Sequence, residues 1–250
     1  MVTLTTRDFH GWPHTQFLAN DTVELILTAD VGPRILGYAL HGGPNVMFLF
    51  EEQLGQTGGQ AFRAYGGHRL WHAPEALPRT YTLDNHPLAV EPVSNGVRLT
   101  MQADEVAGIE KSLEVTLAET GSVATLTHTL VNRTLWPVEL APWSLTQACR
   151  GGLQILPLPP YAPHSPESLL PVNTFTLWSY TNFADPRWHL GDRYITLRQD
   201  PNGFKAQKLG VRVADGWAAY AFKDHLFVKR FAWSPSADYP DHGVNYETYS

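Results

Sequence analysis

Apolar and polar residues alternate with a period of two along much of this 250-residue chain. Val97, Leu99 and Met101 are apolar, and the residues between them are polar. Successive side chains of a β-strand point to opposite faces, so this alternation is typical of strands with one buried face. The pattern recurs at Val23–Ala29, Ser112–Leu117, Val123–Val131, Tyr194–Gln199, Leu209–Val213, Trp217–Phe222 and Leu226–Trp233. It predicts a nearly all-β chain.

Turn-forming residues separate these apolar runs. Asn95-Gly96, Thr120-Gly121, Asn202-Gly203 and Asp215-Gly216 all fall between runs, where asparagine and glycine tolerate the positive φ of hairpin turns. Short strands at this spacing favour an antiparallel sandwich or barrel over β-α-β units. Large β folds reach this length as one unit, so we expect a single domain over residues 1–250.

Two stretches interrupt the alternation. Residues 51–87 are rich in glycine, histidine and proline, and residues 157–192 carry several prolines and aromatic residues. Long loops in compact domains often carry function. Both are predicted to be walls of a binding site.

The composition argues against several classes of partner. The net charge is −6 and there is no basic run, so neither nucleic acid nor an anionic membrane is an expected partner. Cys149 is the only cysteine, the N-terminus lacks a signal-peptide pattern, and no stretch has the roughly 18 apolar residues of a membrane helix. We expect a soluble, cytoplasmic protein. Without a glycine-rich phosphate loop, no cofactor is expected, and the oligomeric state is left open.

The densest group of chemically active residues lies between positions 66 and 75. His68, Arg69, Trp71 and Glu75 supply an imidazole, a guanidinium, an indole and a carboxylate. Sugar sites use such groups, because flat aromatic faces cover C–H groups and planar charged groups bind pairs of hydroxyls. The alternative is a structural Arg–Glu pair with Trp71 in the core.

His68 and His72 are four residues apart, a spacing that grips zinc when it falls on a helix. The glycines before this segment and Pro74 after it disfavour a helix, and no third ligand is evident. No metal site is predicted, and both histidines are expected to be hydrogen-bonded loop residues.

Two further groups follow in the second half of the chain. The first holds Trp178, Asp185 and Arg187. We expect the aspartate and the arginine to bind either each other or a ligand. The second combines Lys229, which shares a strand face with two phenylalanines, with the segment 239–247. The commoner behaviour of such a lysine is to extend its ammonium to water, and the alternative is a polar cavity.

At these groups the sequence resembles the galactose mutarotase-like superfamily, which includes the aldose 1-epimerases, and within it an uncharacterised bacterial branch. The resemblance rests on residues 32–35, 66–75, 84–87, 128–132, 141–143, 178–187 and 239–247. It implies an antiparallel β super-sandwich with a sugar on the concave face of one sheet. It also implies a histidine acid and a glutamate base that open and reclose the sugar ring.

These implications give an aldose 1-epimerase-like isomerase as the leading hypothesis, with a small sugar as the partner. Its catalytic residues would be His68 as the acid and Glu247 or Glu75 as the base. The residues expected to bind the sugar are Arg69, Trp71, Trp178, Asp185, Arg187, Lys229 and Asp241.

Two departures from the family keep alternatives open. Pro142-Trp143 stand where the family's histidine is expected, and the chain is expected to be short at its C-terminus. A carbohydrate-binding or regulatory domain without catalysis is therefore the second hypothesis, and a β domain of a larger lyase or hydrolase is the third.

Overall fold

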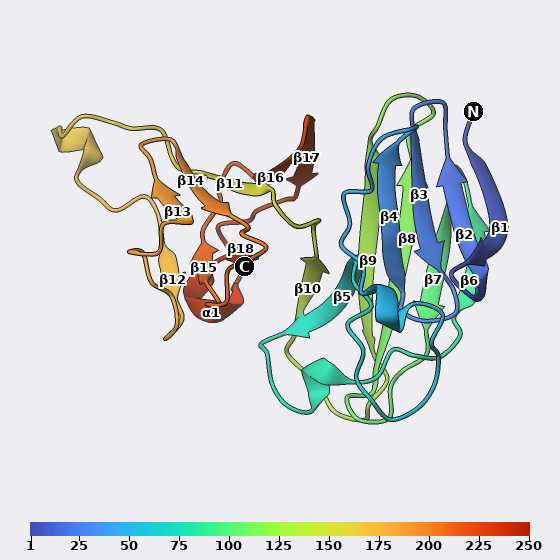
Figure 1. Cartoon of the computed structure of the whole chain (residues 1–250). Coiled ribbons are helices and arrows are strands. Elements are labelled where there is room, and N and C mark those ends of the chain that lie inside the picture. The colour runs from blue at the N-terminus through green and yellow to red at the C-terminus, as the bar shows by residue number, and fades with distance from the viewer. The chain divides into compact units, whose positions relative to one another are not determined.

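A computed structural model describes all 250 residues of the chain (Figure 1). Strands take up 44% of the residues and helices 5%, so the prediction of a nearly all-β antiparallel chain is confirmed. The chain divides into two compact units, Met1–Cys149 (unit 1) and Arg150–Ser250 (unit 2). The expected single domain stays a prediction, because one large β domain can also contain two compact parts.

Unit 1 is built from two antiparallel sheets. A six-stranded sheet has the order β1-β2-β3-β4-β5-β10, and a four-stranded sheet has the order β6-β7-β8-β9. The strands are β1 (Thr3–Phe9), β2 (Trp12–Ala19), β3 (Val23–Thr28), β4 (Arg34–Leu40), β5 (His68–Ala73), β6 (Ala89–Val93), β7 (Gly96–Met101), β8 (Ile109–Leu117), β9 (Ala124–Asn132) and β10 (Ala141–Thr146).

The two sheets of unit 1 pack face to face around one core (Figure 1). Leu25 and Leu27 of β3 meet Leu99 of β7 and Leu113 of β8, and all four side chains are buried. A second cluster, which includes Trp12, Leu36 and Tyr65, covers the other face of the six-stranded sheet. That sheet is therefore buried on both faces, which is unusual for an antiparallel sheet.

Unit 2 also contains two antiparallel sheets. Their orders are β13-β14-β11-β16-β17 and β12-β15-β18. The strands are β11 (Leu153–Pro157), β12 (Phe175–Leu177), β13 (Trp188–Leu190), β14 (Tyr194–Arg198), β15 (Lys208–Val211), β16 (Trp217–Phe222), β17 (His225–Arg230) and β18 (Tyr246–Tyr249). Leu156, Leu197, Leu209 and Val211 bring both sheets into one core.

Helical structure is limited to four short segments. They are η1 (Glu51–Gln53), η2 (Arg79–Tyr81), η3 (Pro166–Ser168) and α1 (Pro240–Gly243). The segment α1 is a left-handed turn, because Asp241, His242 and Gly243 have φ values of 53°, 66° and 84°.

The expectation that His68 and His72 are loop residues is wrong. Residues 68–73 form β5, which lies between β4 and β10, and all six are buried. Alternation of apolar and polar residues indicates a strand with one solvent-exposed face. A strand that is buried on both faces does not show this alternation. His68 and His72 are thus strand residues, and four strand steps of about 3.3 Å separate their backbones by about 13 Å.

Gly67 allows β5 to begin where it does. Its φ is +73°, and a Cβ there would lie 2.1 Å from the carbonyl oxygen of Ile35. Gly121 has nearly the same φ, +74°, but its Cβ would meet no atom within 4 Å. We expect Gly121→Ala to cost about 1 kcal/mol for the left-handed backbone, and Gly67→Ala to cost roughly 1–3 kcal/mol more for the clash. Urea unfolding of both variants tests this, and equal losses would contradict the role given to Gly67.

Candidate functional site

Strand β5 sends its side chains alternately to the two faces of the six-stranded sheet. His68 lies opposite Ile35, whose side chain belongs to the core between the sheets, so His68, Leu70 and His72 face that core. Arg69 and Trp71 face the other way. The acid and the sugar-binding arginine proposed from the sequence thus lie on opposite faces of one strand.

Both ring nitrogens of His68 have partners within unit 1. Nδ1 lies 2.8 Å from Thr146 Oγ1, and Nε2 lies 2.8 Å from Nε2 of His128 on β9. The side chain is buried. The role of His68 as a general acid stays a prediction, and it requires the ring to exchange one of these partners for a sugar oxygen.

Arg69 and four aromatic residues form an arginine–aromatic cluster on the opposite face. Its aromatic members are Phe62, Trp71, Tyr81 and Trp143. The Arg69 guanidinium lies 4.0 Å from the centroid of the Trp71 ring, and its Nε and Nη1 have no hydrogen-bond partner. Burial, with the charge of Arg34 nearby, lowers the pKa of Arg69 to about 9, so the group is a cation at neutral pH.

Glu75 does not pair with Arg69. It is exposed, and its Oε1 accepts a hydrogen bond from the hydroxyl of Tyr81. The alternative of a structural Arg69–Glu75 pair is therefore wrong. The expectation that came with it, that Trp71 lies in the core, is confirmed, since Trp71 is 7% exposed.

Arg34 forms the buried ion pair of this region instead. Its Nη2 pairs with Asp84, and Nη1 donates to the carbonyl oxygens of Ala64 at 2.7 Å and Gly66 at 3.2 Å. The arginine is fully buried. One cation thus ties together the start of β4, the approach to β5 and the segment after η2.

In unit 2, Asp185 and Arg187 clasp each other. The carboxylate accepts hydrogen bonds from Arg187 Nε at 3.0 Å and Nη2 at 2.9 Å, and Nη2 also donates to the carbonyl oxygen of Lys205. These hydrogen bonds hold the pKa of Asp185 below its ordinary value. The geometry agrees with the structural alternative, and sugar binding by this pair stays a prediction.

Four other residues of unit 2 form a group that we call the carboxyl site. They are Trp178, Lys208, Asp241 and Glu247, and the pairing of β15 with β18 brings Lys208 and Glu247 together. Glu247 of β18 lies opposite Gly210 of β15, and Lys208 is two residues before Gly210. Lys208 and Glu247 therefore share the sheet face that points away from the Leu209 and Val211 core.

Short contacts hold the carboxyl site together. Lys208 Nζ lies 2.9 Å from Glu247 Oε2 and 3.8 Å from the centroid of the Trp178 ring. Thr176 of β12 donates a 2.7 Å hydrogen bond to the carbonyl oxygen of Asp241, which fixes the left-handed turn beside the sheet. Strained backbone of this kind is common at functional sites.

Glu247 titrates unusually. Burial raises the pKa of its carboxyl group to about 7; Lys208 opposes this rise, whereas a hydrogen bond with Asp241 adds to it. A carboxyl group that changes charge near neutral pH can take or give a proton under working conditions. Asp241 is exposed, so the site is open to water on this side.

Lys229 lies at the edge of the unit 2 core. It is half-buried, and its Nζ is 5.8 Å from the centroid of the Tyr246 ring. Burial lowers its pKa to about 8. It belongs to unit 2, as do Asp185 and Arg187, whereas His68 and Arg69 belong to unit 1 and lie on opposite faces of β5. The expectation that Lys229 binds a sugar stays a prediction.

Comparison with known proteins does not assign the chain to a family. No family model matches the chain, and neither a curated protein nor a solved structure does. The resemblance to the galactose mutarotase-like superfamily therefore stays a prediction. None of the helices has the length and apolar character that crossing a bilayer requires.

Sequence reasoning missed Lys208 and the Arg34–Asp84 pair. Lys208 directly precedes the predicted strand that begins at Leu209, but its position beside Glu247 depends on the pairing of β15 with β18. Arg34 and Asp84 both lie in stretches that carry the resemblance, and an arginine directly after Gly32-Pro33, at the start of an apolar run, was the available signal.

Proposed function

We propose that this chain is a cytoplasmic carbohydrate-processing protein, an aldose 1-epimerase-like isomerase that acts without a cofactor. The observation that carries the proposal is the Glu247 carboxyl group, whose pKa of about 7 places it between its acid and base forms at neutral pH. Opening a cyclic sugar requires one group that takes a proton and another that gives one.

In this proposal the Glu247 carboxylate takes the proton of the anomeric hydroxyl. The electron pair of that O–H bond forms the carbonyl at C1, and the bond from C1 to the ring oxygen breaks. The Lys208 ammonium, 2.9 Å from Glu247, gives a proton to the ring oxygen as it leaves. After rotation about the C1–C2 bond the steps reverse, so both protons return and the opposite anomer forms.

Trp178 and Asp241 take supporting roles in the same proposal. The half-buried indole offers an apolar face for the C–H groups of the sugar ring. Asp241 raises the pKa of Glu247 through its charge and hydrogen bond, so it tunes the base. These assignments keep Glu247, Trp178 and Asp241 from the sequence hypothesis, and Lys208 takes the place of His68 as the acid.

A sugar-binding domain without catalysis is the second candidate. It is favoured by the arginine–aromatic cluster, in which Arg69 lies on Trp71 with two unpartnered N–H groups. The engaged ring nitrogens of His68 also favour it. Binding of hydroxyl groups by these N–H groups would need no acid or base.

Anomer exchange separates the two candidates. Freshly dissolved single anomers of glucose, galactose, xylose and glucose 6-phosphate are followed by polarimetry and NMR, with binding measured in parallel by calorimetry. We expect at least one sugar to equilibrate faster with the protein than in buffer. Binding without acceleration would establish the second candidate, and neither binding nor acceleration across a broad aldose panel would overturn both.

A further inference from the structure

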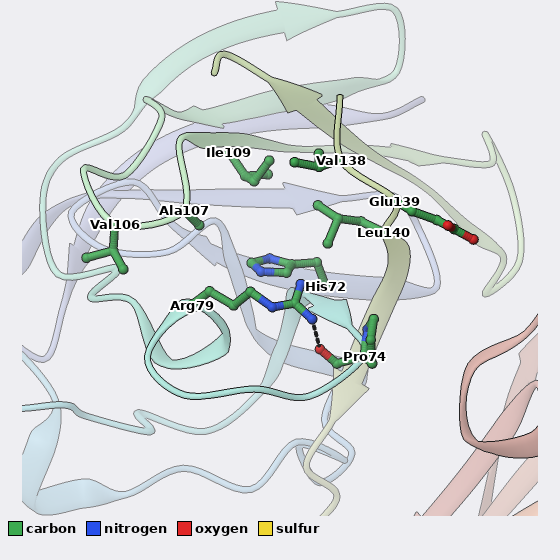
Figure 2. A pocket seen from close by; sticks show the side chains of 9 residues that line it. All are labelled: His72, Pro74, Arg79, Val106, Ala107, Ile109, Val138, Glu139 and Leu140. Atoms are coloured by element: carbon green, nitrogen blue, oxygen red, sulfur yellow. Dashed lines mark hydrogen bonds between the residues drawn. The ribbon is translucent and has the colours of Figure 1, made fainter. Parts of the chain in front are cut away.

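A pocket of about 410 Å³ opens at one end of unit 1 (Figure 2). Its walls come from the end of β5, from η2, from the turn before β8 and from the segment before β10. Volumes of about 300–1,000 Å³ are typical of small-molecule sites. None of its lining residues belongs to the carboxyl site or to the arginine–aromatic cluster.

His72 forms the centre of the pocket wall (Figure 2). Its side chain is fully buried, and neither Nδ1 nor Nε2 has a hydrogen-bond partner. Buried polar atoms almost always have partners, so two orphaned nitrogens in one ring call for an occupant of the space in front of them. Strand pairing fixes the backbone of His72, which lies opposite Pro142 across the sheet.

The charges around the pocket balance. Burial, followed by the charge of Lys111, lowers the pKa of His72 to about 4, so the imidazole is neutral at neutral pH. A neutral imidazole offers one donor and one acceptor. Arg79 and Glu139 line the pocket with one positive and one negative charge. Such a set suits uncharged hydroxyl groups better than an anion or a cation.

The remaining wall is apolar. Val106, Ile109, Val138 and Leu140 face the pocket with hydrocarbon side chains. They would cover the C–H face of a ring but offer no hydrogen bond. A ligand for this pocket therefore combines an apolar face with at least one hydroxyl group that can meet a nitrogen of His72.

We propose that this pocket is a second binding site, for a small uncharged cyclic compound carrying neighbouring hydroxyl groups. His72 is the polar anchor, Arg79 binds a second hydroxyl, and the aliphatic wall covers the ring. The site is independent of the carboxyl site, because it lies entirely within unit 1.

The test uses the full chain and three probes of similar size: cis-1,2-cyclohexanediol, cyclohexanecarboxylate and methylcyclohexane. Binding is followed by ligand-observed NMR and by the ring-proton shifts of His72. We expect the diol to bind and to move the His72 signals. We expect both of the other probes to bind at least about tenfold more weakly, because the carboxylate would lose the hydration of its charge and the hydrocarbon offers no hydrogen bond.

Four variants separate the site from its surroundings. His72→Phe removes both nitrogens, and Val138→Phe fills the pocket but keeps His72; both should weaken diol binding by about tenfold or more. His72→Gln, which keeps a donor and an acceptor, and Val123→Phe, at an exposed valine of the same unit, should retain it.

The proposal is overturned if the diol does not bind the wild-type chain, which would indicate that water alone fills the pocket. It is also overturned if the hydrocarbon binds as well as the diol, or if Val138→Phe leaves diol binding intact. Because Glu247→Gln should not affect diol binding, failure here and failure of the proposed isomerase are distinguishable.

Discussion

Glu247→Gln is expected to lower the rate of anomer exchange by roughly 10²–10⁴-fold, with sugar affinity nearly unchanged. Glutamine keeps the size of the side chain and can still hydrogen-bond, but it cannot take a proton. The loss should therefore appear in kcat and not in KM. Polarimetric kinetics measure both, and circular dichroism checks that the fold is kept. A matched control is Glu167→Gln, an exposed glutamate of the same unit, which should retain full activity.

The pH dependence of the rate of anomer exchange tests the role of Glu247 further. As a base, Glu247 must be ionised, so the wild-type rate should fall as the pH drops through about 7. Asp241 raises this pKa, so Asp241→Asn should move the acidic limb of the profile to lower pH. Asparagine tolerates the left-handed backbone at position 241, so the turn is preserved. An active Glu247→Gln enzyme, or a limb that stays in place in Asp241→Asn, would remove Glu247 from the mechanism.

Asp84→Asn is expected to destabilise unit 1 by about 3–5 kcal/mol. The Arg34 side chain is fully buried, and loss of the carboxylate would leave its charge without an ionic partner. Hydrogen exchange of the amides of β3, β4 and β5 reports on this unit directly. Protection in these strands should fall together, because the same arginine also binds the carbonyl oxygens of Ala64 and Gly66.

Two comparisons identify the cause of that loss. Replacing both partners by apolar residues, in Arg34→Met with Asp84→Leu, should cost less than the sum of the two single changes, because no unpaired charge remains. Glu91→Gln breaks the exposed pair with Arg98 and should change stability by no more than about 0.5 kcal/mol. If Asp84→Asn behaved like Glu91→Gln, the buried pair would not hold this region.

The strands best predicted from the sequence are those with one solvent-exposed face. In β8 buried and half-buried residues alternate along all nine positions, and the sequence pattern located its second part, Ser112–Leu117. The turn before β7 was also readable, since Asn95 adopts φ 55° between the paired residues Val93 and Gly96. Strand β5 was not readable, because polar residues there are buried on both faces of the sheet.

The candidate site was predictable only in its parts. The sequence pointed to Trp178, Asp241 and Glu247, which lie in two separate stretches of unit 2, residues 178–187 and 239–247. Lys208 joins them only because β15 pairs with β18 in one particular register. A shift by one residue would turn Glu247 to the other face of the sheet, and no local pattern fixes that register. For His72 the sequence suggests only a zinc ligand or a hydrogen-bonded residue. Its burial without a hydrogen-bond partner depends on tertiary packing, which the sequence does not show.

The left-handed turn at Asp241, His242 and Gly243 bears on how the protein could be engineered. Glycine adopts this backbone most readily, and most other residues cost about 1–2 kcal/mol each, although asparagine and aspartate tolerate it better. A designer seeking stability would replace both Asp241 and His242 by glycine. The two positions are not equivalent, because Asp241 carries the carboxyl group that tunes Glu247, whereas the exposed His242 contributes no contact to the carboxyl site. Stability and activity thus compete at one residue of the turn and can be improved separately at the next.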